Sequence, residues 1–361
     1  MPGSRRYRHV VGSRDSPIAD IVLGSSVFAL LAFLLGVTAV SLPVATARAA
    51  VKPVPALPRM VPEARDDSFA TWRSRHWFEL RGRTDLVRTI TIAYRTYTGA
   101  VRPAIVILPG WYGRRDHPPI PLVISPHGRG ITPPENVRLW GNMPELGRFA
   151  VVNPAGPNAY TWGAPGQIAD LARMPRIVRR AVPWLRIARH RIYAIGGSMG
   201  GQETLLLMAK HPRLLAGAIS FDADTNLAAR YAAFPELRRG RWLQQRVVEE
   251  VGGTPSARPE AWRERSPIDD ARLLATDGVP LQIWWSTRDK IVVHQASESG
   301  LLYRTIKRIN PAAPVTQYVG TWRHTAEMWP TRRMPLALAA MGLLRIGPAA
   351  GVDRDKTRSQ A

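Results

Sequence analysis

The chain has 361 residues and a formal net charge of +23, which comes from 50 lysines and arginines against 27 acidic residues. It contains no cysteine, which excludes disulfides, thiolate metal sites and a lipid-modified cysteine in this chain. Arginine supplies nearly all of the positive charge and is spread along the chain without long runs, so no nucleic-acid partner is expected.

The first 50 residues have the pattern of an export segment. Residues 21–44 contain no charged side chain and are rich in Leu, Val, Ala and Phe, and Ala-Thr-Ala follows directly. Four arginines precede this stretch: Arg5, Arg6, Arg8 and Arg14. A basic start, an apolar stretch and an A-x-A site are typical of a secretory signal peptide, although the stretch is also long enough to span a bilayer. We expect 1–50 to be a signal peptide or an N-terminal membrane anchor, the only membrane contact of a secreted or extracytoplasmic membrane-anchored protein.

The rest of the chain is expected to form one folded domain between two extended segments. Residues 51–84 are rich in proline and predict a tether and lead-in, whereas 347–361 are small and polar and predict a disordered tail. Within the domain at 85–346, residues 88–97 alternate in the manner of a half-exposed strand. Residues 104–109 form a short apolar run, which predicts that the two segments pair as an antiparallel hairpin at the edge of a sheet.

The next strand leads into a turn that could stabilise negative charge. Residues 121–126 read as a buried strand, and His127-Gly128-Arg129-Gly130 follows at once. An H-G-x-G turn after an early strand can aim a backbone N–H at the position where charge develops on a substrate oxygen. We expect the amide of Arg129 to be this donor, with that of Gly128 as the alternative. His127 is not expected to be catalytic.

The most informative segment lies after a further buried strand at 149–154 and a helix at 168–185, in which Pro175 and Pro183 predict breaks or a helix start. The apolar run 191–195 leads into Gly-Gly-Ser-Met-Gly-Gly, with the serine at 198, and then into a helical stretch.

A strand, a G-x-S-x-G turn and a helix make up the nucleophile elbow of a serine hydrolase. Gly196 and Gly200 remove the bulk that would keep strand and helix apart, so Ser198 is the expected nucleophile. The amide of Met199 would be the second donor to the oxyanion. The alternative is a glycine-rich βα turn that binds phosphate, but G-x-G-x-x-G spacing and a P-loop lysine are absent.

Downstream, residues 222–276 are rich in Arg, Glu, Ala and Leu and lack strand-like runs, which predicts a helical insertion or lid over the site. A strand at 280–285 then ends in a short polar loop that contains Asp289, the expected acid of a catalytic triad. This assignment of Asp289 has two alternatives. Asp289 could be a helix N-cap, or the acid could be Asp222 or Asp224, which follow the strand at 215–221.

Three histidines follow Ser198 in the sequence. His324 lies on a loop just after the last predicted strand, at 314–319, where a general base could reach the serine, so we expect it to be the base. His211 and His294 are expected to be structural, at a helix end and a helix start. A closing helix is expected at 336–346.

Together these motifs resemble the α/β-hydrolases, close to the branch that holds prolyl oligopeptidase catalytic domains, dienelactone hydrolases and secreted feruloyl or polyester esterases. The matching segments are H-G-R-G at 127–130, G-G-S-M-G-G at 196–201, S-T-R-D at 286–289 and G-T-W-R-H at 320–324. The resemblance covers roughly 85–346. It implies an α/β fold with a mostly parallel eight-stranded sheet flanked by helices, and a Ser-His-Asp triad at the strand ends. One departure is that no propeller-like repeat precedes the domain.

The expected function is hydrolysis of carboxylic esters, with a small-molecule or polymeric ester as the partner and with no cofactor or metal. A prolyl oligopeptidase-like serine peptidase is the alternative, and a non-catalytic envelope binding protein with this fold is a third possibility. Three aromatic groups fall in loops at strand ends and predict either a substrate pocket or ordinary loop packing: Trp111-Tyr112, Tyr160-Thr161-Trp162 and Trp322.

Overall fold

The computed structural model describes residues 72–80, 83–113 and 116–345. The chain divides into two units, 1–63 and 64–361, and every described residue belongs to the second. The predicted signal peptide or anchor, most of the tether and the predicted tail therefore lie outside the described residues. Within the described part, every helix is too short or too polar to cross a bilayer.

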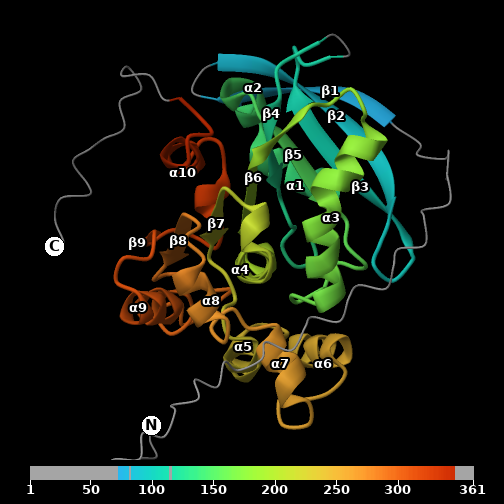
Figure 1. The fold of residues 1–361 in the computed structure, drawn as a ribbon. Coiled ribbons are helices and arrows are strands. Elements are labelled where there is room, and N and C mark those ends of the chain that lie inside the picture. The colour runs from blue at the N-terminus through green and yellow to red at the C-terminus, as the bar shows by residue number, and fades with distance from the viewer. Residues whose placement is uncertain (1–71, 81–82, 114–115, 346–361) are drawn as a thin grey trace, which may run out of the picture. The chain divides into compact units, whose positions relative to one another are not determined.

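A single sheet runs through the described unit (Figure 1), in the order β1-β2-β3-β5-β4-β6-β7-β8-β9. The first three strands and β5 pair antiparallel, and all pairings from β5 through β4 to β9 are parallel. The strands are β1 (Trp72–Leu80), β2 (Arg83–Arg95), β3 (Val101–Pro109), β4 (Ile120–Ile124), β5 (Ala150–Pro154), β6 (Ile187–Gly197), β7 (Gly217–Phe221), β8 (Leu281–Ser286) and β9 (Val315–Gly320).

The sheet confirms the predicted mostly parallel architecture and corrects its extent. It has nine strands instead of eight, because β1 lies in the segment that the sequence assigned to the lead-in. The domain therefore begins before residue 85. The predicted hairpin of 88–97 with 104–109 is present as the antiparallel pair β2 and β3. The parallel strands β4 and β7 are buried along their whole length, which explains why they read as continuous apolar runs.

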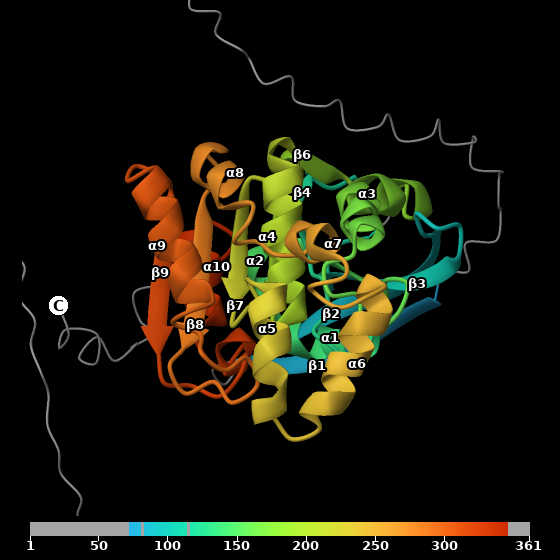
Figure 2. The ribbon, with the colours of Figure 1, turned by 90° about the horizontal axis from the view of Figure 1, so that it is seen from below.

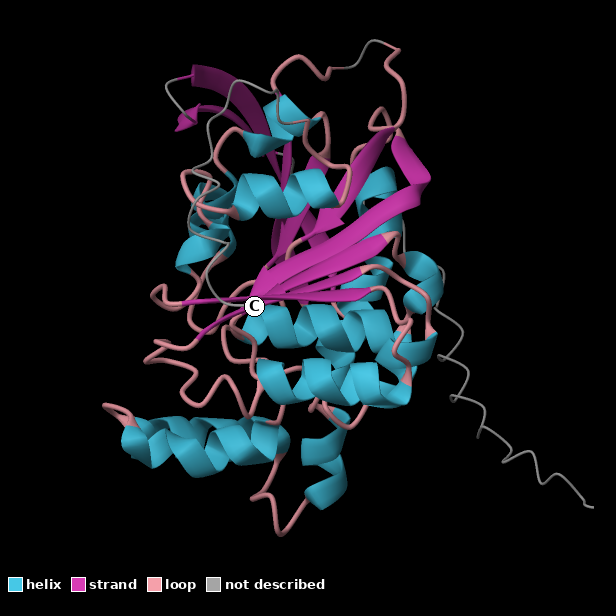
Figure 3. Cartoon of the chain, turned by 90° about the vertical axis from the view of Figure 1, so that its left-hand side faces the viewer, coloured by secondary structure: helices cyan, strands magenta, loops and turns pink. Residues whose placement is uncertain are grey.

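Helices cover both sides of the sheet (Figure 3). One apolar cluster joins the sheet to α3, α4, α8 and α9, and a second joins it to α1, α2 and α10. The helices are α1 (Pro133–Trp140), α2 (Met143–Gly147), α3 (Pro165–Ala181), α4 (Met199–Lys210), α5 (Leu227–Ala233), α6 (Gly240–Val251), α7 (Pro259–Glu264), α8 (Ala271–Thr276), α9 (Ser299–Ile309) and α10 (Met334–Ala340).

Two helix predictions need correction. Helix α3 runs through Pro175, which does not break it, and ends before Pro183. Met174 and Pro175 are buried, and this packing outweighs the backbone hydrogen bond that proline removes. His294 does not open a helix. It adopts a positive φ of 62° in a turn well before α9, and its imidazole lies 2.8 Å from Glu236.

Helices α5, α6 and α7 lie together below the sheet in Figure 1 and toward the viewer in Figure 2, and we call this group the cap. The cap has its own apolar cluster, in which Phe234, Leu243 and Trp262 pack with Trp162 and with Met199 of the elbow. It corresponds to the predicted insertion, but α8 does not belong to it. Ala271 and Leu274 of α8 are part of the cluster on the sheet, so the insertion is shorter than 222–276.

Candidate active site

Ser198 lies at the sharp turn between β6 and α4. Its φ of 58° and ψ of −130° fall in a region that residues with a side chain rarely adopt. The turn is held on both sides, since the Ser198 amide donates to Phe221 O at 2.8 Å and the Gln202 amide donates to Ser198 O at 3.0 Å. A strained serine between a strand and a helix is the geometry of a nucleophile elbow.

The glycines around Ser198 are required by close packing. A Cβ on Gly196 would overlap the carbonyl oxygen of Gly200, and a Cβ on Gly200 would overlap that of Pro126. Strand β6, helix α4 and the loop after β4 therefore meet at van der Waals distance only because these positions carry no side chain. This is the steric reason that the sequence pattern predicted.

His324 and Asp289 form a hydrogen-bonded pair next to this turn. The Nδ1 of His324 lies 2.7 Å from Oδ2 of Asp289. The other carboxylate oxygen of Asp289 accepts from the amides of Ile291 and Val292 at 2.8 and 3.0 Å. The Asp289 side chain is 1% exposed and that of His324 is 16% exposed, so the imidazole is the member of the pair that reaches the surface. This arrangement can hold the imidazole in one tautomer and stabilise its protonated form.

The loop that carries His324 lies against the elbow. A Cβ on Gly197, the residue before Ser198, would overlap the Met328 side chain and come within 2.9 Å of Thr325 Cγ2. The serine, the aspartate and the histidine follow β6, β8 and β9, whose carboxyl ends share one edge of the parallel sheet. The fold thus brings the three predicted triad residues to the same edge.

Asp222, an alternative acid in the sequence, has a different set of partners. Its carboxylate accepts from the Thr325 amide at 2.7 Å, from Trp322 Nε1 at 3.0 Å and from the Ser286 amide at 2.9 Å. These donors flank His324 on both sides and include the end of β8. Asp222 therefore fastens the histidine loop to the sheet, while Asp289 holds the imidazole itself. Asp224, the other alternative, pairs with Arg230 at 2.7 Å.

The pKa of Asp222 is raised to about 6, first because the side chain is buried and to a lesser degree because Asp289 is close. His324 and the donors from Thr325 and Trp322 oppose this rise. Since the folded-state pKa exceeds the ordinary value of 3.8, the contribution of Asp222 to stability is present below pH 4 and is lost as pH rises through 6. The hydrogen bonds that Asp222 accepts from the loop of His324 depend on pH in the opposite sense. The ionised carboxylate is the better acceptor, so these bonds are stronger at higher pH.

We therefore expect kcat/KM to fall as pH drops through 6, with no loss of Tm attributable to Asp222 in the same range. Asp222→Asn removes this ionisation, so its acid limb should be shallower than that of the wild type. The measurement is a pH–rate profile paired with thermal melts. Superimposable acid limbs for the two proteins would show that Asp222 does not titrate in the working range.

Asp222, Asp289 and His324 also offer three ligand atoms within 4.8 Å of one another, a spacing that a cation could bridge. Their hydrogen bonds argue for another use. The carboxylate oxygens of both aspartates already accept N–H groups, and the imidazole Nδ1 is taken by Asp289. The three side chains therefore fit a His324–Asp289 acid–base pair supported by Asp222 better than they fit a metal site.

The H-G-R-G loop after β4 packs directly on the elbow. A Cβ on Gly128 would lie 3.8 Å from Gly197 O. The amides of Gly130 and Ile131 are used within the loops, by Ala159 O at 2.9 Å and Gly128 O at 3.1 Å. The amides of Gly128 and Arg129 make no backbone hydrogen bond to any residue that the structure describes. Both predicted donors are therefore free to bind an oxyanion.

Met199, the other predicted oxyanion donor, occupies the first position of α4. An amide at this position has no intrahelical acceptor, and it carries the partial positive charge of the helix N-terminus. The donor pair expected for an oxyanion hole thus lies on two segments in mutual contact.

The imidazole of His127 lies between two backbone carbonyl groups. The side chain is buried, and its Nε2 and Nδ1 lie 3.0 Å from Ala155 O and 2.9 Å from Gly128 O. Its imidazole thereby ties the H-G-R-G loop to the loop after β5.

Glu203 is a buried carboxyl group on α4, close to the elbow. It is fully buried, and it accepts hydrogen bonds from Thr161 Oγ1 and, at 3.2 Å, from Gln167 Nε2. Burial raises its pKa, and the nearby His127 opposes the rise. The side chain therefore connects the loop after β5 to the first turns of α4.

Of the aromatic residues predicted near the site, most are packing residues. Tyr112 and Trp162 are buried in apolar clusters, and Trp322 is held by Asp222. Tyr160 is partly exposed and makes an edge contact with Trp242 of the cap at 5.9 Å between ring centroids.

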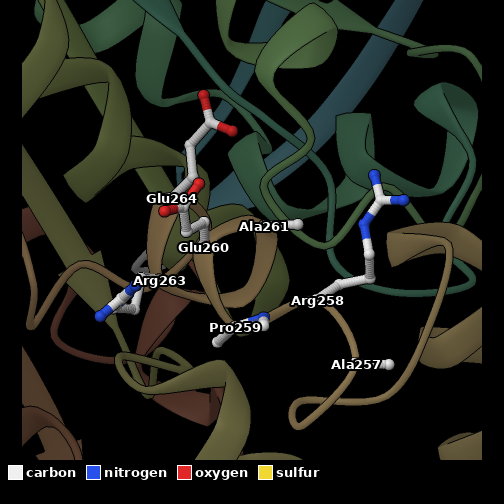
Figure 4. A pocket seen from close by; sticks show the side chains of 7 residues that line it. All are labelled: Ala257, Arg258, Pro259, Glu260, Ala261, Arg263 and Glu264. Atoms are coloured by element: carbon white, nitrogen blue, oxygen red, sulfur yellow. The ribbon is translucent and has the colours of Figure 1, made fainter.

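A separate hollow of about 440 Å³ lies on the cap. Seven residues of 257–264 line it (Figure 4), whereas Trp262 of the same segment turns into the apolar cluster of the cap. Its charged residues are two arginines and two glutamates, which balance one another: Arg258, Arg263, Glu260 and Glu264. None of the triad candidates lines it, so it is not the site described above.

No family model matches the chain, and no curated protein matches its sequence. Solved structures match its fold. The fluorophosphonate-binding serine hydrolase FphF of Staphylococcus aureus, in a substrate-bound structure, is 16% identical with a TM-score of 0.53, over 70% of this chain and 98% of FphF. An acylaminoacyl peptidase of Pyrococcus horikoshii is 17% identical with a TM-score of 0.52, over 76% of this chain but 41% of the peptidase. Fungal esterase structures from Rhizomucor miehei are matched at 13% identity and a TM-score of 0.53, over 73% of this chain and 83% of theirs.

The chain has the α/β-hydrolase fold. The fold implied by the four motifs is thereby confirmed. The support role of Asp222 and the buried Glu203 were not predicted from the sequence. A carboxylate directly after a strand was a signal for Asp222, but its partners Trp322 and Thr325 lie about 100 residues further along the chain. Nothing in the local pattern around Glu203 marked it, because it reads as one more polar residue of an elbow helix.

Proposed function

We propose that this protein cleaves carboxylic esters through an acyl-enzyme intermediate. The observation that carries the proposal is the strained Ser198, with the loop of the His324–Asp289 pair packed against its turn. Neither strain at the serine nor a histidine–carboxylate pair is needed for a fold that only binds. The strained turn can present the serine hydroxyl, and the pair can take its proton.

In the proposed mechanism Ser198 Oγ attacks the ester carbonyl while His324 Nε2 takes its proton. The carbonyl oxygen becomes an oxyanion, which the amides of Met199 and of Arg129 or Gly128 stabilise. His324 then gives the proton to the leaving alkoxide, and the acyl group stays on the serine. His324 takes a proton from water, whose oxygen attacks the acyl carbonyl, and the bond to Ser198 Oγ then breaks. The acid is released and His324 returns the proton to Ser198 Oγ.

Ester hydrolysis is favoured over peptide hydrolysis by the way the fold matches its neighbours. The similarity extends over 83% of the fungal esterase but over 41% of the acylaminoacyl peptidase, so the shared part is most of the first protein and a fraction of the second. The peptidase reading stays as the second candidate, because the same triad geometry serves amide cleavage.

The test is a paired turnover assay on the full-length chain with p-nitrophenyl acyl esters of increasing length and with proline-terminated amides. We expect measurable ester hydrolysis and kcat/KM for amides at least about 10²-fold lower, since the amine is the poorer leaving group. Comparable or faster amide cleavage would replace the esterase proposal with the peptidase one.

We also propose that residues 1–50 direct export, which rests on their basic start, apolar stretch and A-x-A site. N-terminal sequencing of the protein recovered from its native cell envelope or medium tests this. A cytoplasmic protein with an intact N-terminus would contradict it.

A further inference from the structure

Arg129 stands out among the arginines near the site because its guanidinium is unoccupied. The side chain is half-buried, and it makes no hydrogen bond or ion pair to any other residue that the structure describes. Other buried arginines nearby are engaged. Arg230 contacts Asp224 and donates to Ile291 O, and Arg265 donates to Thr161 O and Glu250 O. A half-buried guanidinium without a protein partner is available to a ligand that offers acceptor oxygens.

The charges around Arg129 leave room for an anion. Asp224 is the acidic group that interacts with it, and Arg230 and Tyr160 are its other electrostatic neighbours. Asp224 forms its ion pair with Arg230, so its interaction with Arg129 is electrostatic and without direct contact. Burial raises the pKa of Asp224 and lowers that of Arg129, in each case the effect of burial on a charged group. One Arg230 nitrogen, Nη1, is buried without a hydrogen-bond partner among the described residues.

The position of Arg129 places this charge between the catalytic loops and the cap. Its neighbour Gly128 lies against Gly197 of the elbow, while Asp224 also interacts electrostatically with His324 and Asp289. On the other side, a Cβ on Gly130 would lie 3.9 Å from the Tyr160 hydroxyl, and Tyr160 packs on the 43% exposed Trp242 of the cap. A group bound by Arg129 would therefore be close to the reacting carbonyl and next to an aromatic wall.

We propose that Arg129 binds a carboxylate on the substrate, so that the preferred substrate is an ester with a negative charge near the scissile bond. This inference rests on the proposed ester hydrolysis. A guanidinium presents a rigid fork that matches a carboxylate with two hydrogen bonds, and it does so more strongly where water is partly excluded. The substrate carboxylate would supply a second negative charge, beside that of Asp224, next to Arg129 and Arg230.

The experiment compares charged esters with their neutral counterparts. The first pair, mono-p-nitrophenyl glutarate and its methyl ester, places the carboxylate on the acyl side. The second pair, 4-acetoxybenzoate and its methyl ester, places it on the leaving group. The readout is the ratio of kcat/KM for the charged and neutral member of each pair. An effect of substitution on the oxyanion hole cancels in this ratio, because the backbone amide of residue 129 serves both members.

We expect the wild type to prefer the charged member of at least one pair. Arg129→Gln should lower that ratio about 10- to 100-fold, as loss of a charge-assisted contact does, and Arg129→Lys should restore part of it. Arg272→Gln, at an exposed arginine of α8, is the matched control and should leave the ratio unchanged.

Three results would overturn the inference. The wild type could show no preference for charge in either pair, or Arg129→Gln could keep the wild-type ratio, or Arg272→Gln could lower it equally. Each of these leaves ester hydrolysis standing, since the esters are still turned over. If no ester is hydrolysed and fluorophosphonate does not label Ser198, the proposed function has failed and this inference fails with it.

Discussion

Replacing Ser198 with alanine is expected to lower kcat for ester hydrolysis by at least ~10³-fold and to leave the fold unchanged. The reason is that the hydroxyl forms the covalent intermediate, and no other described residue occupies the strained turn between β6 and α4. Alanine keeps the Cβ and removes only the oxygen, so the backbone contacts of the turn to Phe221 O and from Gln202 can persist.

Two measurements accompany the kinetics of Ser198→Ala. A thermal melt and a circular dichroism spectrum should match those of the wild type, since alanine keeps the Cβ and with it the strain of the turn. Near-normal turnover in a folded Ser198→Ala protein would remove the serine from the mechanism.

The second large effect is expected at Asp289. Asp289→Asn should reduce kcat by about 10²- to 10⁴-fold at pH 8, because the amide cannot hold the His324 tautomer or stabilise the imidazolium. The 2.7 Å contact from His324 Nδ1 to Asp289 Oδ2 is the basis for this expectation. Asp222→Asn is the matched comparison, since both aspartates are buried and lie beside the same loop.

For Asp222→Asn we expect a smaller loss in kcat, about tenfold, together with a lower Tm. Its carboxylate supports Thr325, Trp322 and Ser286 through hydrogen bonds, and the NH₂ group of asparagine would face one of these donors. The reverse order, with the greater kinetic loss at Asp222, would assign the acid of the triad to Asp222. Histidine pKa values from NMR in each variant would show the same exchange of roles.

The parts of the fold that the sequence predicted well are those with local signals. The buried parallel strands appear as uninterrupted apolar runs, and β4 and β7 were placed within a few residues. Strand β1 was missed because Trp72–Leu80 mixes Arg73, Arg75 and Glu79 with aromatic residues and lacks a clear apolar face. An edge strand needs less apolar sequence than a central one, so such a segment gives a weak signal.

The residues of the candidate site also divide into those with a local sequence signal and those without one. Ser198, Asp289 and His324 each lie on a loop directly after a strand, so strand prediction alone put them at one edge of the sheet. The sequence favoured Asp289 over Asp222 but left both open, because both follow strands and their distinguishing contacts come from a loop far along the chain. No sequence pattern could indicate that the Arg129 guanidinium lacks a partner among the described residues, because this depends on the ion pair between Arg230 and Asp224.

The central claim is that Ser198 is a nucleophile activated by His324, and covalent labelling tests it most directly. The wild-type protein is treated with a fluorophosphonate, digested, and the modified residue is located by mass spectrometry. We predict a single phosphonyl adduct on Ser198, absent in Ser198→Ala and formed much more slowly in His324→Ala. A wild-type protein that is folded and yet stays unlabelled at Ser198, or that carries the adduct on another residue, would contradict the account.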